Sequence, residues 1–446
     1  MNTKIDELKK INASLNAVVS FVEPNLGGTG KISGWDIALK DNFNMVGTLT
    51  TASCNLLSNH KSIYNAHAVD RMLAEGAVVL AKTSMDELGM GGTNLSAVTG
   101  PVKNPYDATR ISGGSSGGSA ALVGARAIRV AMGSDTGDSV RKPAAFCGAV
   151  GVKPTYGRIS RYGVIPYASS LDHVGYFTQN IADAAVMLEV LAGRDDRDMT
   201  SSFAPVDTYS ENLTMDLKGK RIGVFKSVHD TISNTAFTDA FAAFAKHVEA
   251  QGAILVEKEM DLELLRAVLP VYSVISNSEA VANHANLDGV RYGLSQDGET
   301  LEEIMKRTRT NGFSSMIKKR FVYGAYALDD IHQEEVFNQA KRVRRVIVDA
   351  YRSLFADVDA MVVLASGQIA PKIEGPFMDE SSDEYLIAEN HMVINNFAGF
   401  PSLTLPLGLV EGMPIGLNVT TLPFTESTMF AYAHEFEKLI NWKGAF

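Results

Sequence analysis

The sequence predicts an α/β protein in which helices cover a mostly parallel or mixed β-sheet. Short apolar runs alternate with helical patterns in the first third of the chain, and the same order returns near its middle. In residues 65–75, Val69, Met72 and Leu73 fall on one helical face, and residues 77–81 follow as an apolar run typical of a buried strand. This order of elements is typical of sheets covered by helices.

The later elements extend this prediction. We expect a strand at residues 221–225, a helix at 235–251 and a second strand at 253–256. Residues from about 261 to 354 are mainly helical in pattern and richly charged, which indicates a helical layer or subdomain, and residues 426–439 resemble an amphipathic helix. No linker, low-complexity tract or repeat divides the chain, so we expect one domain over residues 1–446.

The composition excludes several classes of protein. Apolar residues make up 46% and charged residues 21% of the chain, which is the balance of an ordinary globular protein. Its 41 Lys and Arg against 51 Asp and Glu give a net charge of −10, so no chain-wide basic field attracts nucleic acid. Two cysteines cannot form a disulfide framework, and neither a signal peptide nor a membrane span is present. We expect a cytoplasmic protein with no membrane partner.

Two segments rich in glycine and serine are the strongest candidates for a functional site. Residues 113–119 read GGSSGGS, and residues 133–143 read GSDTGDSVRKP. Glycine lets the backbone approach a ligand closely, and serines among glycines present hydroxyl and amide groups together. This pattern favours an oxyanion site, but an isolated GGSSGG run is equally consistent with a flexible turn that caps a helix.

A serine nucleophile needs a base, and the sequence leaves a lysine as the candidate. None of the nine histidines lies within either segment, no G-x-S-x-G motif is present, and no histidine pair has the spacing of a helical zinc site, so no metal is predicted. Lys40 ends an apolar, strand-like run, where burial would lower its pKa toward the range that a base needs. The residue types alone also fit a solvated lysine at a strand end.

Together these residues resemble the amidase signature family. Lys40 lies in LKDN, Ser115 in GGSSGGSAA and Ser139 in GSDTGDSVRKPAAFCG, and both serines fit the long Gly/Ser pattern of that family without a gap. The similarity continues through residues 153–185 and nearly to the C-terminus at residues 412–417. It covers most of the chain and implies a central mixed β-sheet covered by helices on both faces.

Three stretches are most similar to one branch of the family, the glutaminase (A) subunits of tRNA-dependent amidotransferases. They are residues 153–172, 288–293 and 319–328. This resemblance implies that the chain hydrolyses glutamine and supplies ammonia to convert Glu-tRNA(Gln) into Gln-tRNA(Gln). It also implies a heterotrimer with a B subunit, which binds the tRNA and activates glutamate with ATP and Mg²⁺, and a small C subunit. No cofactor is expected in this chain.

The resemblance further implies a Ser-cisSer-Lys triad. Neutral Lys40 would take a proton from Ser115, which is held by a cis peptide bond and relays the proton from Ser139, so that Ser139 attacks the amide carbon. Ammonia then leaves, and water releases the acyl group. The backbone N–H groups expected to face the oxyanion are those of Thr136, Gly137 and Asp138.

The same resemblance assigns the groups that bind glutamine. Arg320 would meet the α-carboxylate, because its guanidinium fork suits a carboxylate. Glu389, which stands in place of an aspartate, would meet the α-amino group, and Tyr272 would line the same pocket. By residue type alone, Arg320 instead fits an ion pair on a helix surface.

Several residues depart from the pattern of the family. Asp138 replaces the glycine usual before the nucleophile, Glu389 is one methylene longer than the expected acid, and His173 and Tyr176 replace Gln and Pro. These departures keep open a second hypothesis, a stand-alone amidase of the same family that hydrolyses another small amide. A third hypothesis is a catalytically inactive scaffold subunit, against which the intact triad argues.

Overall fold

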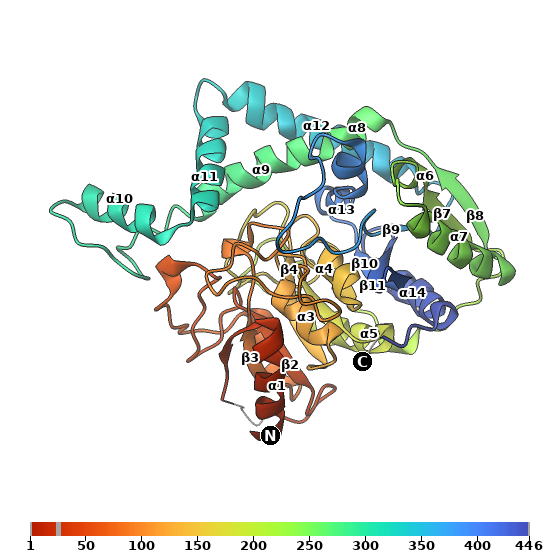
Figure 1. The fold of residues 1–446 in the computed structure, drawn as a ribbon, viewed down its shortest axis with the longest axis horizontal. Coiled ribbons are helices and arrows are strands. Elements are labelled where there is room, and N and C mark those ends of the chain that lie inside the picture. The colour runs from red at the N-terminus through yellow and green to blue at the C-terminus, as the bar shows by residue number, and fades with distance from the viewer. Residues whose placement is uncertain (1, 24–27, 445–446) are drawn as a thin grey trace.

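The strands of one mixed β-sheet organise the chain. The computed structural model describes residues 2–23 and 28–444, in which an 11-stranded sheet has the order β1-β3-β2-β4-β6-β5-β10-β11-β9-β7-β8 (Figure 1). The predicted fold class is confirmed. The strands are β1 Val18–Phe21, β2 Asp36–Lys40, β3 Val78–Thr83, β4 Val130–Asp135, β5 Val150–Lys153, β6 His173–Thr178, β7 Arg221–Phe225, β8 Ile254–Lys258, β9 Ala360–Leu364, β10 Ser402–Val410 and β11 Met413–Thr420.

The helices follow the expected segments within one or two residues at most ends. The predicted helix at 235–251 is α7, the one at 426–439 is α14, and the helical stretch from 261 to 354 contains α8 to α12. The helices are α1 Asn2–Leu15, α2 His67–Ala74, α3 Gly117–Gly124, α4 Arg141–Cys147, α5 Ile181–Leu191, α6 Lys226–His229, α7 Thr235–Ala250, α8 Leu262–Arg266, α9 Val268–Asn283, α10 Leu301–Gly312, α11 Ser315–Leu328, α12 Gln339–Ser353, α13 Val393–Ala398 and α14 Glu426–Ile440.

The sheet is mixed rather than mostly parallel. Strand β2 runs parallel to both β3 and β4, and β7 runs parallel to both β8 and β9. The other pairs are antiparallel, including the hairpin of β10 and β11, whose register runs from Ser402 opposite Thr420 to Val410 opposite Met413. The parallel group around β2 is the part of the sheet that positions the candidate site.

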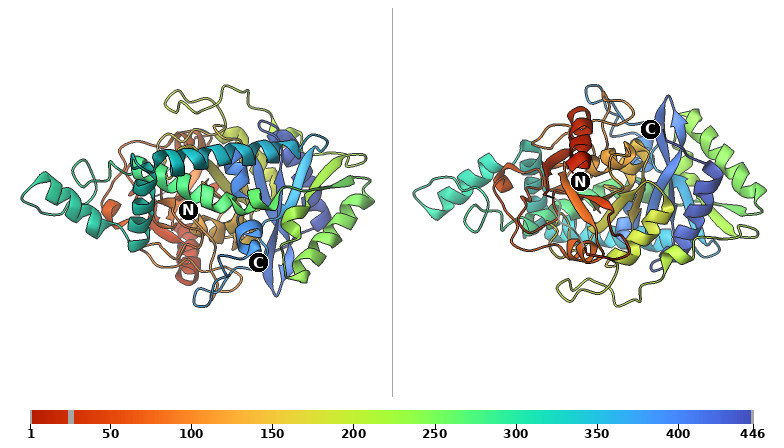
Figure 2. Two further views of the ribbon diagram at one scale, coloured as in Figure 1. Left: turned by 90° about the horizontal axis from the view of Figure 1, so that it is seen from above. Right: turned by 90° about the horizontal axis from the view of Figure 1, so that it is seen from below.

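Apolar side chains are buried on both faces of the sheet. Successive residues of a strand point to opposite faces, and in β2 Ile37 and Leu39 join one core cluster while Ala38 joins another. The first cluster includes Leu188 of α5, and the second includes Leu122 of α3. Helices therefore cover both faces, as the two turned views show (Figure 2).

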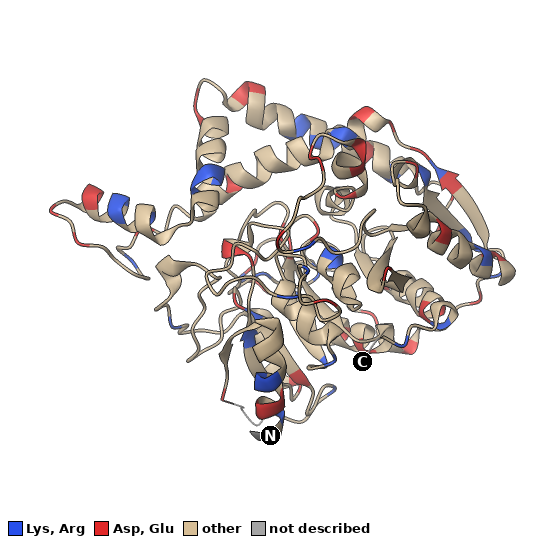
Figure 3. Cartoon of the chain, viewed as in Figure 1, with Lys and Arg blue, Asp and Glu red and all other residues tan. Residues whose placement is uncertain are grey.

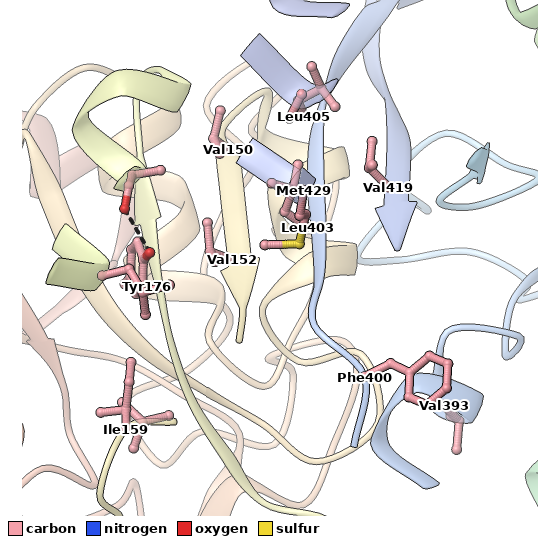
Figure 4. Close-up of a cluster of buried hydrophobic side chains, with 14 of the residues drawn as sticks. Val150, Val152, Ile159, Tyr176, Val393, Phe400, Leu403, Leu405, Val419 and Met429 are labelled. Atoms are coloured by element: carbon pink, nitrogen blue, oxygen red, sulfur yellow. Dashed lines mark hydrogen bonds between the residues drawn. The ribbon is translucent and has the colours of Figure 1, made fainter. Parts of the chain in front are cut away.

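The middle of the sheet is filled by large side chains from segments far apart in the sequence. Val152 of β5, Leu403 of β10 and Met429 of α14 gather beside this part of the sheet (Figure 4). Tyr176 of β6 lies fully buried at the edge of this group of side chains. Its hydroxyl donates a hydrogen bond of 2.7 Å to the Ala184 carbonyl (Figure 4). Tyr176, which replaces the Pro of the family pattern, is therefore accommodated inside the core, because its hydroxyl has a hydrogen-bond partner.

The helical stretch α8 to α12 lies along one side of the molecule, and α10 projects from it (Figure 1). Charges of both signs line α10, where Glu303 pairs with Arg307 at 2.9 Å (Figure 3). Whether this stretch is a subdomain of a single 1–446 domain stays a prediction. In the described part of the chain, no helix has the length and apolar character needed to cross a membrane.

Candidate active site

Lys40, Ser115 and Ser139 come from three segments that meet at one edge of the sheet. Lys40 is the last residue of β2, and β2 runs parallel to β4, which ends at Asp135 and leads into the loop that carries Ser139. Parallel strands end at the same edge of a sheet, so this pairing brings Lys40 beside the loop. Ser115 lies just before α3, which packs against β2 and β4.

Lys40 is completely buried and surrounded by hydroxyl groups. Its Nζ lies 2.7 Å from Ser115 Oγ, 2.8 Å from Ser116 Oγ and 3.0 Å from Ser134 Oγ. Burial lowers the pKa of Lys40 to about 7, although nearby carboxylates such as Asp86 act in the opposite direction. The interpretation of Lys40 as a solvated strand-end residue is therefore wrong, because the strand carries it into the interior.

The GGSSGGS segment is closely packed, and its last three residues form the start of α3. Its Gly114–Ser115 peptide bond is cis. A Cβ atom at Gly114 would lie 2.1 Å from Asp86 Oδ2, and one at Gly118 would lie 2.4 Å from the Ala17 carbonyl oxygen. The glycines are required because the backbone lies against its neighbours without room for a side chain.

The loop of residues 136–139 presents a hydroxyl and several amides that are unpaired. Ser139 is only 4% exposed, and its carbonyl accepts a hydrogen bond of 3.2 Å from the Ser116 N–H. Within residues 2–23 and 28–444, neither the Ser139 hydroxyl nor the N–H groups of residues 136–139 have a hydrogen-bond partner. Asp138 does not have a positive φ, so its side chain adds no backbone strain of that kind. These free donors are available to an incoming oxygen.

A buried ion pair that sequence analysis missed holds this loop in place. The Arg141 guanidinium donates to both carboxylate oxygens of Asp135, at 2.9 and 3.1 Å, and to the Gly137 carbonyl at 2.7 Å. Burial alone would raise the pKa of Asp135, but Arg141 reverses this effect and holds that pKa well below its usual range. Asn396 of α13 completes the network by donating to Asp135 Oδ1 at 2.9 Å. The only sequence signal was the Arg two residues after Ser139.

The predicted substrate residues line one cavity beside this loop. The cavity has a volume of about 370 Å³, and we call it the Arg320 cavity. A Cβ atom at Gly137 would lie 3.2 Å from the Tyr272 ring, which shows how closely that ring covers the loop. The residues of the Arg320 cavity that were predicted from the sequence are Gly137, Asp138, Tyr272, Arg320 and Glu389.

Arg320 has no acidic partner. Its Nη1 donates to the Tyr167 hydroxyl at 2.9 Å, and its Nε lies 3.2 Å from Met316 Sδ. No carboxylate lies within ion-pair distance of Arg320 in the described part of the chain, so the interpretation as a surface helix ion pair is wrong. A half-buried guanidinium without a counterion favours binding of an anion.

Lys142, which sequence analysis did not single out, links the two acids of the cavity. Its Nζ lies 2.8 Å from Asp138 Oδ2 and 3.6 Å from Glu389 Oε2, and it also donates to the Glu389 carbonyl. Glu389 Oε1 accepts hydrogen bonds from Ser366 Oγ at 2.7 Å and from the Gly367 N–H at 2.8 Å. Glu389 Oε2 is therefore the carboxylate oxygen that remains for a ligand. Asp138 adds a negative charge to the loop of residues 136–139, and the positive charge of Lys142 balances it.

Comparison with known proteins agrees with this geometry. A model of the amidase family matches residues 24–430. The chain belongs to the amidase signature family. This confirms the resemblance predicted from the sequence. In the described residues, no group of three or more His, Cys, Asp or Glu side chains is arranged to hold a metal ion.

Several relatives of this chain carry the same name. The chain is 37% identical to the A subunit of the glutamyl-tRNA(Gln) amidotransferase of Pseudomonas aeruginosa, an alignment covering 99% of this chain and 93% of that protein. It is 36% identical to the protein of that name from Sulfurihydrogenibium, with 93% and 84% covered. The crystal structure of the Thermotoga maritima protein of the same name matches with a TM-score of 0.83 at 31% identity, covering 98% of this chain and 90% of that one.

The ion pair between Asp138 and Lys142 is expected to stabilise the fold, because removing one partner leaves a mostly buried charge uncompensated. We expect Lys142→Met to lower the free energy of unfolding by about 3 kcal/mol. Asp138→Asn combined with Lys142→Met should be less destabilising than the sum of the two single changes, by about 1 to 3 kcal/mol. Urea denaturation measures all three variants.

A matched control is Lys226→Met. Lys226 also lies between two carboxylates, those of Asp230 and Glu259, but its side chain is 34% exposed. We expect a much smaller loss of stability for Lys226→Met, because water screens this exposed ion pair. Equal losses for the two lysines, or strict additivity at Asp138 and Lys142, would contradict the coupling.

Proposed function

We propose that this chain is the glutamine-hydrolysing (A) subunit of an amidotransferase that converts Glu-tRNA(Gln) into Gln-tRNA(Gln). The observation that carries this proposal is the Arg320 guanidinium, which has no carboxylate partner among the described residues and lines the same cavity as the loop before Ser139. That cavity is lined by a guanidinium that can bind an anion, by an acid, and by the part of the loop whose N–H groups are free. The names of the relatives in Pseudomonas and Thermotoga support the same assignment.

The chemistry begins with the buried amine. Lys40 has a pKa of about 7, so a large fraction of it is neutral near neutral pH and able to accept a proton from Ser115 Oγ, 2.7 Å away. Ser115 in turn takes the proton of Ser139, and Ser139 Oγ bonds to the amide carbon. The oxyanion meets the free N–H groups of Thr136, Gly137 and Asp138, a type of contact worth about 3 to 4 kcal/mol per donor. The proton passes to the amide nitrogen, ammonia leaves, and water frees glutamate.

Recognition of glutamine uses the opposite charges of the Arg320 cavity. Arg320 binds the α-carboxylate, and its position is fixed by the Tyr167 hydroxyl. The α-ammonium group meets Glu389 Oε2, close to Asp138 and Lys142. Tyr272 covers the oxyanion loop, and burial raises its pKa well above the usual range, so it stays neutral.

The tRNA and ATP belong to other subunits in this proposal. The chain carries a net charge of −10 and needs no broad grip on tRNA, because a B subunit binds Glu-tRNA and activates it with ATP and Mg²⁺. A small C subunit completes a cytoplasmic heterotrimer. This chain needs no cofactor of its own, because its nucleophile, base and oxyanion donors are all protein groups.

One observation favours a second candidate, a stand-alone amidase for another small amide. Lys142 occupies part of the space around Glu389, and Glu389 Oε1 is already bonded to Ser366 and Gly367. A substrate without an α-amino group would then fit the cavity equally well. Glutamine and a simple aliphatic amide therefore have to be compared directly.

Changing Ser139 to Ala is expected to abolish glutamate release from glutamine, because it removes the nucleophile and leaves the loop intact. The assay uses the full chain, alone and with B and C subunits, ATP and Glu-tRNA(Gln). Release that depends on Ser139 and rises in the complex supports the proposal. Hydrolysis of simple amides with no glutamine turnover in either setting would assign the chain to the stand-alone amidases.

The rate of hydrolysis should depend on pH through Lys40. Lys40 must be neutral to act as the base, so kcat/KM should fall as pH drops below its pKa of about 7 and level off above it. Measurement between about pH 5.5 and 8.5 covers this range. Lys40→Ala should lose about 10² to 10⁴ of the activity and also the inflection. An inflection near 7 that persists in Lys40→Ala would assign it to another group.

Replacing Arg320 with Ala should separate binding from chemistry. Loss of a charged hydrogen bond worth about 1.5 to 3 kcal/mol raises KM for glutamine by about 10- to 100-fold. Hydrolysis of propionamide, which has no carboxylate, should stay within about twofold of the wild type. The control is Arg345→Ala, whose side chain is 78% exposed on α12. Equal losses on both amides would point to a folding role for Arg320.

A further inference from the structure

A second cavity borders the loop of residues 136–139 at Thr136. It has a volume of about 250 Å³, and we call it the His173 cavity. Its inner end is formed by Asn42, Thr136 and His173, all of them buried. Its outer end includes Met199, which is 84% exposed. The His173 cavity therefore extends from the surface to the candidate active site.

The inner end reaches the residues that handle the proton. Ser134, which lines the cavity, accepts hydrogen bonds of 3.0 Å from both Lys40 Nζ and Asn42 Nδ2. A Cβ atom on Gly89, another lining residue, would lie 3.9 Å from Ser115 Oγ. The Arg320 cavity, in contrast, meets the same loop at Gly137 and Asp138. The two cavities thus meet the same loop at different residues, and the His173 cavity is the one that reaches the neighbours of Lys40 and Ser115.

Two residues that line the His173 cavity each carry a buried hydrogen-bond acceptor without a partner. His173 Nδ1 lies 2.6 Å from the Leu171 carbonyl, so that nitrogen carries the hydrogen and Nε2 is an acceptor. Burial lowers the pKa of His173 well below its usual range, which keeps the ring neutral. Within the described ranges of the chain, His173 Nε2 and Asn42 Oδ1 both lack a hydrogen-bond partner. Buried unpaired acceptors favour a ligand that donates N–H bonds.

The His173 cavity is larger than ammonia requires, and part of its wall is apolar. A water molecule, which is similar in size to ammonia, takes up about 30 Å³. The His173 cavity is lined by apolar residues such as Val164, Ile165 and Pro166, together with charged residues such as Arg161 and Asp172. The Tyr167 hydroxyl bonds to Arg320, so this residue forms part of the wall between the two cavities. The polar residues at the inner end suit the nitrogen of an amine, and the apolar part of the wall suits a short carbon chain attached to it.

We propose that the His173 cavity receives the amine half of the substrate and that the chain also hydrolyses γ-glutamyl amides whose nitrogen carries a small alkyl group. This inference rests on the glutamine hydrolysis proposed above for Ser139. Ser139 Oγ bonds to the γ-carbon, the C–N bond breaks, and the proton lost by Ser139 reaches the nitrogen through Ser115. The alkylamine leaves into the His173 cavity. Water then adds to the ester carbon, returns one proton to Ser139, and releases glutamate.

The test compares glutamate release from L-glutamine and from N5-ethyl-L-glutamine by the full chain. We expect the two kcat/KM values to agree within about tenfold, because the ethyl group finds an apolar space of its own. A kcat/KM for the ethyl compound more than about 200-fold below that for glutamine, the upper range for one badly fitting methylene, would overturn the inference. It would leave the proposed glutaminase function standing. No release from either compound would overturn both.

A cavity-filling variant provides a second readout. Val164→Phe should lower the ratio of kcat/KM for N5-ethylglutamine over glutamine by about tenfold or more, because the ring occupies the space of the ethyl group. The matched control is Val346→Phe, on the surface of α12, where the valine is 53% exposed. We expect the ratio of kcat/KM for N5-ethylglutamine over glutamine in Val346→Phe to equal the wild-type ratio. An unchanged ratio in folded Val164→Phe would overturn the inference, and if that variant fails to fold, the wild-type comparison alone decides.

Discussion

The candidate site depends on keeping an amine in the protein interior without giving it a carboxylate. Lys40 Nζ contacts hydroxyl and carbonyl oxygens only, and within the described residues no acid lies within ion-pair distance. Lys82 in the adjacent strand β3 is buried equally deeply, yet its Nζ pairs with Asp41 at 2.9 Å. Two neighbouring buried lysines therefore have different surroundings. The unpaired one lies beside Ser115, where an easily lost proton is useful.

The other groups at this edge of the sheet are arranged around the Lys40 amine. Its hydroxyl partners lie on the loop before α3 and in β4, and the close packing of Gly114 in that loop and of Gly118 in α3 brings the loop within reach. The Asp135–Arg141 pair then fixes the loop of residues 136–139 while leaving its N–H groups free. Donors that are fixed before the substrate arrives stabilise an oxyanion without a cost of reorganisation. A structural ion pair thus supports a site whose own groups remain unpaired.

Much of the fold and of the triad could be predicted from the sequence, because each leaves a local signal. Apolar periodicity identified β7 and α7, and the Gly/Ser segments identified Ser115 and Ser139. Burial has no such signal: residue types favoured a solvated Lys40 and an ion-paired Arg320, and both interpretations failed. Their surroundings come from segments more than 70 residues away, such as Ser115 for Lys40 and Tyr167 for Arg320. Lys142 was missed for the same reason, because its second acid is Glu389, 247 residues away. The sequence marked His173 as a departure from the family pattern, and only the folded chain shows that it shares a cavity with Asn42 and Thr136.

The two cavities differ in the kind of selectivity that their walls can provide. The Arg320 cavity contains charged groups, and a site built to bind charges rejects substrates that leave those charges unpaired. Part of the wall of the His173 cavity is apolar, formed by residues such as Val164 and Ile165, and an apolar surface discriminates weakly between groups that differ by a methylene. In the proposed reaction, the acyl side of the substrate is therefore expected to be selected more strictly than the amine side. The Tyr167–Arg320 contact links the two cavities, because Tyr167 lines the His173 cavity and Arg320 lines the other, so a change at either residue reaches both sides of the proposed reaction.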